Sequence, residues 1–88
     1  MSQELRQARS ELEDAVERAD DDVREDLRET AAAFAEYASD DATPDHAVFD
    51  EHLNTLRQAR ERATGDVETR IDSALERAEE YRQGIEQA

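Results

Sequence analysis

The chain has 88 residues, of which 25 are acidic and 11 basic, giving a formal net charge of −14, and it contains no cysteine. This length predicts one domain spanning residues 1–88, and the absence of cysteine excludes disulfides, thiolate metal sites and thiol nucleophiles. No apolar run approaches the roughly 18 residues of a membrane span. The first residues also lack the basic and apolar segments of a signal peptide, so we expect a cytoplasmic protein.

All 11 basic residues are arginine. Carboxylates keep their hydration where water activity is low, and arginine is a more weakly hydrated cation than lysine. A Debye length of about 3 Å at 1 M salt also suppresses the repulsion among the carboxylates. The composition therefore indicates a protein of a halophile, whose folding depends on salt.

In the first half of the chain, apolar positions recur at spacings of 3, 4 and 4 residues. This period corresponds to about 3.67 residues per turn and predicts nearly straight helix. High charge with few aromatic residues is typical of disorder, but a disordered chain would not keep such a stripe. The predicted inward positions are Leu5, Ala8, Leu12, Val16, Ala19, Val23, Leu27, Thr30, Phe34 and Ala38 in the first half and Phe49, Leu53, Leu56, Ala63, Val67, Ile71, Ala74, Ala78, Tyr81 and Ile85 in the second.

The segment from Asp40 to Pro44 is the clearest boundary between helices. Thr43 has a side chain that suits an N-cap, Pro44 suits the first position of a helix, and Asp45 stabilises the positive end of the helix dipole. One helical region is therefore expected to end before this segment and another to begin within it.

Two weaker boundaries lie 44 residues apart. The later one is Thr64-Gly65-Asp66, which predicts a helix end with a left-handed glycine and a new N-cap at Asp66. The earlier one is Asp20-Asp21-Asp22, where Asp22 and Glu25 have the spacing of a capping box.

Two all-α architectures follow from these boundaries. If both weaker breaks occur, the chain forms four short helices near residues 2–19, 22–39, 44–63 and 66–86 in an up-down bundle. If neither occurs, two long helices form a hairpin that must dimerise to bury its stripe. The unbroken apolar phase through Val23 and Val67 favours the hairpin. Gly65 and the repeated Asp-Val pair favour the bundle, which is the architecture we expect.

The same offset indicates an internal repeat. A shift of 44 residues superposes Glu17-Arg18-Ala19 on Glu61-Arg62-Ala63 and makes nine of 44 positions identical. Chance would give about four or five identities at this composition. A duplication into repeats 1–44 and 45–88 is therefore one interpretation of the domain.

His46 and His52 are the two histidines of the chain, and with Asp50 they are the candidates for a metal site. His46 and Asp50 lie one turn apart on a helix, but His52 lies about 120° around the axis from His46. We expect no metal site and no cofactor, because the two histidines do not converge. No serine–histidine–acid set, catalytic carboxylate pair or glycine-rich phosphate loop occurs, so we expect no catalytic residue and no enzyme.

Residues 30–35 read Thr-Ala-Ala-Ala-Phe-Ala and form the longest uncharged stretch of a chain that is 41% charged. Small side chains let a second helix approach closely. We therefore expect Ala32, Ala33, Phe34 and Tyr37 to lie at or beside a contact between two copies in a homodimer. Ordinary helix surface is the alternative, because alanine is the best helix former.

Three short segments resemble a family of short, acidic, all-helical haloarchaeal proteins: Pro44-Asp45-His46, then His52 with Leu56, and Glu80-Tyr81-Arg82. The resemblance covers nearly the whole chain and implies a helical fold and a high-salt habitat. The family is uncharacterised, so the resemblance implies no activity and no site residues. Gly84-Ile85 stands where members often carry Gly-Val, which is a departure from the pattern.

These observations predict a non-enzymatic helical interaction or scaffold protein of a halophile. A small regulator that acts on nucleic acid, or on a nucleic-acid-binding protein through its acidic face, is the alternative. The interspersed arginines argue against mimicry of phosphates. Direct binding of nucleic acid is not expected, because the chain has no arginine run and no aromatic stacking platform, and phosphate affinity falls steeply with salt.

Overall fold

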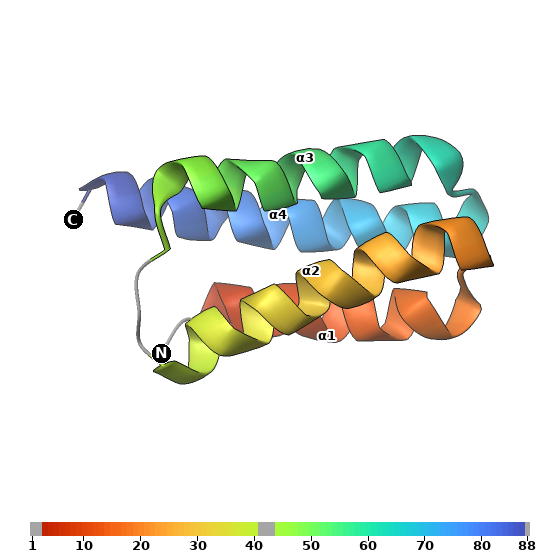
Figure 1. The fold of residues 1–88 in the computed structure, drawn as a ribbon, viewed down its shortest axis with the longest axis horizontal. Helices are drawn as coiled ribbons and strands as arrows, with labels where there is room; N and C mark the ends of the chain where they lie inside the picture. The colour runs from red at the N-terminus through yellow and green to blue at the C-terminus, as the bar shows by residue number, and fades with distance from the viewer. Residues whose placement is uncertain (1–2, 41–43, 88) are drawn as a thin grey trace.

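The computed structural model describes residues 3–40 and 44–87, with side chains described for residues 3–39 and 44–84. Its four α-helices run alternately up and down along one long axis: α1 (Gln3–Arg18), α2 (Asp21–Asp40), α3 (His46–Arg62) and α4 (Gly65–Gln87) (Figure 1). Helix α1 packs against α2 and α4, and α3 packs against the same two helices. The predicted all-α bundle of four short helices is therefore confirmed, and the hairpin of two long helices is not formed.

Two residues, Ala19 and Asp20, connect α1 to α2. The carbonyl oxygen of Asp20 accepts hydrogen bonds from the amides of Val23 (3.0 Å) and Arg24 (2.8 Å), so Asp20 occupies the N-cap position. The predicted N-cap, Asp22, is therefore wrong by two residues. Ala19 and Val23 are both buried on either side of the link. Their spacing of four residues therefore fits this tight reversal as well as it fits a continuous helix.

The guanidinium group of Arg24 fixes this reversal. It donates to the carbonyl oxygen of Val16 (3.3 Å), in the last turn of α1, and to that of Ala19 (2.7 Å), in the link. The last carbonyl groups of a helix lack partners within it, so a side chain of α2 here caps the end of α1 and joins the two helices.

The second tight link, from α3 to α4, contains Ala63 and Thr64. The Ala63 amide donates to the carbonyl oxygens of Ala59 (3.0 Å) and Arg60 (3.2 Å), which ends α3. Gly65 has a φ of 59°, as the prediction of a left-handed glycine requires. Helix α4 begins at this glycine, so the predicted N-cap Asp66 lies inside the first turn.

Helix α3 begins two residues later than the sequence predicts. Asp45, with φ of −64° and ψ of 137°, is its N-cap and makes no cap hydrogen bond with its side chain. The Asp45 carbonyl oxygen accepts the Phe49 amide at 2.9 Å. Pro44 therefore precedes the helix instead of starting it, and the predicted N-cap Thr43 lies outside the described residues.

The core contains apolar side chains from all four helices. The predicted stripe is largely correct, but Ala15 is fully buried where Val16 was expected, and Leu75 is buried beside Ala74. Ala63 and Tyr81 are half-buried, and the side chain of Ile85 lies outside the described ones. Each helix packs against two neighbours, so its buried face is wider than one line of positions. Val16 is consequently displaced to a half-buried position at the edge of the core.

Candidate interaction surface

The three candidate metal ligands do not meet in space. His46 is the exposed first residue of α3, Asp50 is engaged by Arg82, and His52 is half-buried between aromatic rings. Within the described ranges, no group of three or more histidine and carboxylate side chains could hold a metal ion. Of the three residues, Asp50 makes a charged contact with another helix.

Asp50 and Arg82 form a two-pronged ion pair between α3 and α4. Arg82 Nε donates to Asp50 Oδ1 at 2.6 Å, and Arg82 Nη2 donates to Asp50 Oδ2 at 3.2 Å. These hydrogen bonds lower the pKa of Asp50, and the positive charges of Arg82 and His46 act in the same direction. Asp50 is thus held as a carboxylate at the aromatic end of the bundle.

All four phenylalanine and tyrosine residues gather with His52 in one cluster. Phe34 stacks on Phe49 with ring centroids 5.6 Å apart, and Tyr81 lies 5.4 Å from Phe49. The Tyr37 hydroxyl lies 3.5 Å from His52 Nε2. Desolvation raises the pKa of both tyrosines, with Glu36 adding to the effect at Tyr37. The cluster supplies packing energy between α2, α3 and α4.

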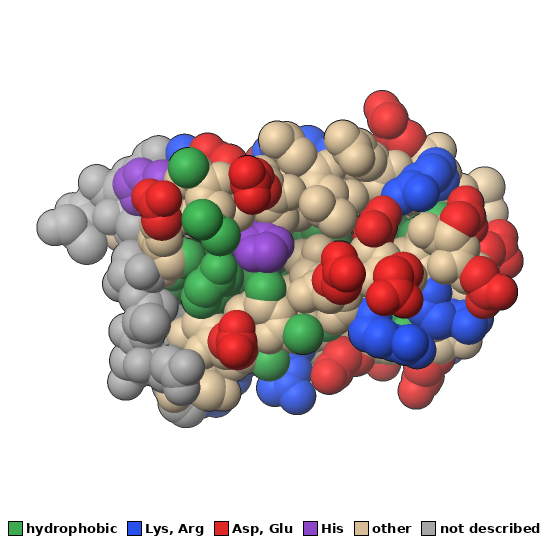
Figure 2. Space-filling view, viewed as in Figure 1, with side chains coloured by type: hydrophobic (Ala, Val, Ile, Leu, Met, Phe, Trp, Pro, Cys, Tyr) green, Lys and Arg blue, Asp and Glu red, His purple; other side chains and the backbone are tan. Residues whose placement is uncertain are grey.

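Arginine–carboxylate pairs cross three of the four seams between neighbouring helices. The pairs are Arg18–Asp66, Arg70–Glu11 and Arg70–Asp14 between α1 and α4, Arg57–Glu79, Arg60–Asp72 and Arg82–Asp50 between α3 and α4, and Arg62–Asp26 between α2 and α3. Figure 2 shows acidic and basic side chains interspersed on one face of the bundle. Between the side chains that the structure describes, no such pair crosses the α1/α2 seam.

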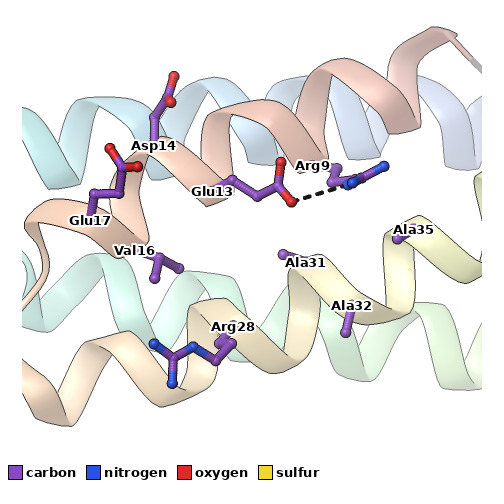
Figure 3. A pocket seen from close by; sticks show the side chains of 9 residues that line it. All are labelled: Arg9, Glu13, Asp14, Val16, Glu17, Arg28, Ala31, Ala32 and Ala35. Atoms are coloured by element: carbon purple, nitrogen blue, oxygen red, sulfur yellow. Dashed lines mark hydrogen bonds and ion pairs between the residues drawn. The ribbon is translucent and has the colours of Figure 1, made fainter.

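The α1/α2 seam contains a groove of about 600 Å³ (Figure 3). Its apolar part consists of Val16 from α1 and Ala31, Ala32 and Ala35 from α2. Its charged lining consists of Arg9, Glu13, Asp14, Glu17 and Arg28. Arg9 binds Glu13 on its own helix at 3.3 Å, so this pair does not bridge the groove.

The four predicted contact residues occupy different environments. Ala32 is exposed and lines the α1/α2 groove, whereas Ala33 is half-buried and does not line it. Phe34 is fully buried among its own helices, and Tyr37 belongs to the aromatic cluster. Contact with a second copy therefore stays a prediction, and Ala32 is the member whose position best suits it.

Of the nine residues that line the α1/α2 groove, the sequence placed only Ala32 at a contact, and Val16 and Arg28 are among the eight that were missed. The signal for Val16 was its neighbour Ala15, because two adjacent apolar residues on α1 indicate a buried face with an apolar edge. Arg28 gave no signal of its own among so many exposed charges.

Fold and surface together define the class: a small up-down four-helix bundle with a charged exterior and a groove lined by alanine. The model of a family of unknown function, DUF7553, matches residues 1–84, and the chain belongs to this family. The predicted membership of an uncharacterised family is confirmed at this level, and a haloarchaeal source stays a prediction. No curated protein and no solved structure gives a significant match. Among the described residues, no helix has the length and apolar character needed to cross a membrane.

Proposed function

We propose that this protein is a non-enzymatic helical interaction or scaffold protein that acts as a homodimer in the cytoplasm of a halophile. The observation that carries the proposal is the α1/α2 groove, in which exposed Ala32 lies beside Ala31 and Ala35. Small side chains allow helix axes to approach to about 8 Å, the lower end of the usual range. A second helix can therefore pack closely here.

The distribution of ion pairs between helices supports the α1/α2 groove, and not the other three seams, as the contact surface. Pairs such as Arg60–Asp72 and Arg62–Asp26 tie the chain's own helices together along the other seams. The lining of the α1/α2 groove combines small apolar residues with charged ones, and protein interfaces likewise combine an apolar centre with a polar rim.

The test is the mass of the protein by sedimentation equilibrium at about 1 M KCl, where long-range repulsion is screened. The parent should be a dimer. Ala32→Glu should raise the dimer dissociation constant roughly 5- to 150-fold, because an unpaired polar group buried at a contact costs about 1–3 kcal/mol. Far-UV circular dichroism should show unchanged helix content, because glutamate is a good helix former.

Ala47→Glu is the matched control. Ala47 is exposed on α3 and does not line the groove, so the same change of charge should leave the dissociation constant unaltered. A monomeric parent would refute the homodimer, and equal effects of the two substitutions would remove the α1/α2 groove as the contact.

A regulator of nucleic acid or of a nucleic-acid-binding protein is the alternative function. It would need an unbroken acidic face, whereas arginines lie among the carboxylates on the face shown in Figure 2. Several arginines also bind carboxylates of neighbouring helices. This pairing supports the interaction protein as the better proposal.

A further inference from the structure

The outer face of α2 carries a charge pattern that suits one particular arrangement of two copies. Arg28, Ala32 and Glu36 follow one another at intervals of four residues, and all three are exposed. On an α-helix this spacing places them along one inclined ridge, with about one turn between successive members and about 80° around the axis from Arg28 to Glu36. Ala32 therefore stands midway between a positive and a negative side chain.

Arg28 differs from the other arginines of the chain. In the described part of the structure, it alone among the eleven has neither a hydrogen bond nor an ion pair. It lines the α1/α2 groove beside Ala32 (Figure 3). Glu36 likewise makes no hydrogen bond or ion pair within the described residues. Both charges are available to a partner.

We propose that two copies pack α2 against α2 in antiparallel orientation around a twofold axis at Ala32, with Arg28 of each copy bound to Glu36 of the other. This inference rests on the proposed homodimer. In an antiparallel pair, a residue four positions before the axis faces the residue four positions after it. The contact is therefore self-complementary, as a twofold interface requires. A parallel pair would instead place Arg28 on Arg28 and Glu36 on Glu36.

The first experiment uses the absence of cysteine from the chain. Ala32→Cys introduces a single thiol. On the twofold axis, the Cα atoms of the two cysteines should lie within the separation of about 4.4–6.8 Å that a disulfide allows. Mild oxidation should convert this variant almost completely to a covalent dimer, seen by non-reducing electrophoresis.

Ser39→Cys is the control on the same exposed helix. In the proposed register, two copies of residue 39 are separated by about 14 residues of helix, or roughly 21 Å. This variant should stay uncrosslinked under the same oxidation. Crosslinking of Ser39→Cys with none of Ala32→Cys would overturn the register.

The second experiment exchanges the charges. Arg28→Glu alone, and Glu36→Arg alone, each create two repulsive contacts in the dimer and should raise its dissociation constant about tenfold at moderate salt. The double variant restores both pairs with the charges exchanged, and its dissociation constant should return to within about threefold of that of the parent. Circular dichroism checks that each variant is folded.

The outcomes separate this inference from the proposed function. A dimeric parent that is weakened by Ala32→Glu, but shows no rescue in the double variant, keeps the homodimer and overturns the Arg28–Glu36 register. A monomeric parent overturns both. Rescue together with the Ala32→Cys crosslink supports the antiparallel arrangement.

Discussion

Raising salt from about 0.1 M to about 1 M should stabilise the folded bundle by about 5 kcal/mol. The radius of gyration is 12.0 Å, so the protein approximates a sphere of about 15 Å radius. A charge of −14 on that sphere costs about 10 kcal/mol at 0.1 M and about 4 kcal/mol at 1 M salt. The unfolded chain has a radius of gyration of about 29 Å. The same charge on this larger volume costs about 2 kcal/mol at 0.1 M salt and about 1 kcal/mol at 1 M salt. The net cost of folding thus falls from about 8 to about 3 kcal/mol.

This change is comparable to the whole stability of the domain. At about 0.05–0.15 kcal/mol per residue, 88 residues give roughly 4–13 kcal/mol. The measurement is urea unfolding followed by far-UV circular dichroism at a series of KCl concentrations. The free energy of unfolding should rise with salt, and at the lowest salt the unfolded fraction should become measurable.

A variant of reduced charge tests the reasoning directly. Glu51, Glu61, Glu68 and Glu76 are exposed on α3 and α4, and none has an ion pair within the described structure. Changing all four to glutamine takes the charge from −14 to −10. Because repulsion scales with the square of the charge, the salt effect should halve to about 2.5 kcal/mol. Full cooperative folding of the parent at 0.1 M, with the stability it has at 1 M, would refute the argument. So would an undiminished salt effect in the variant.

Two further predictions concern the aromatic end of the bundle. Phe34→Ala should cost about 3–5 kcal/mol in urea unfolding, because this ring is fully buried and stacks on Phe49 at 5.6 Å. Val48→Ala, whose side chain is 41% exposed, should cost less than about 1 kcal/mol, and similar losses would contradict the described core. Asp50→Asn should lose stability relative to the parent above the unfolded pKa of the carboxyl group. Arg82 lowers the pKa of Asp50 in the folded state, so the stability difference between parent and variant should disappear as the pH falls through that lowered pKa. A stability difference that stays constant in acid would exclude the ion pair as its cause.

The helices could be predicted from the sequence because their signals are local. The apolar period and the two Asp-Val segments place each helix boundary within two residues of the structure. The N-cap of α2 could not be predicted, because three successive aspartates at residues 20–22 offer equivalent side chains. The choice of Asp20 depends on Arg24 reaching back to the carbonyls of α1, which is a tertiary contact.

The candidate surface was predicted only in part, for a similar reason. The uncharged stretch around Ala32 is visible in the sequence, and its residues Ala31, Ala32 and Ala35 line the α1/α2 groove. The burial of Phe34 was predicted from the apolar stripe, but its stacking on Phe49 depends on how another helix packs, which the sequence does not show. The meeting of Phe34, Tyr37, Phe49 and Tyr81 likewise requires the order of helix packing, because these residues belong to three different helices.

The use of arginine as the cation of this chain has a structural consequence. Arg70 contacts three carboxylates from two helices, Glu11 at 3.5 Å and Asp14 and Asp66 at 3.4 Å. A planar guanidinium with five donors can hold several acceptors in a fixed geometry, whereas a lysine ammonium acts as a compact point charge. Arginines of this kind bridge three seams of the bundle. At the fourth seam Arg28 has no ion pair with any side chain that the structure describes. The same chemistry therefore supports the α1/α2 side as the place where a second chain supplies a carboxylate.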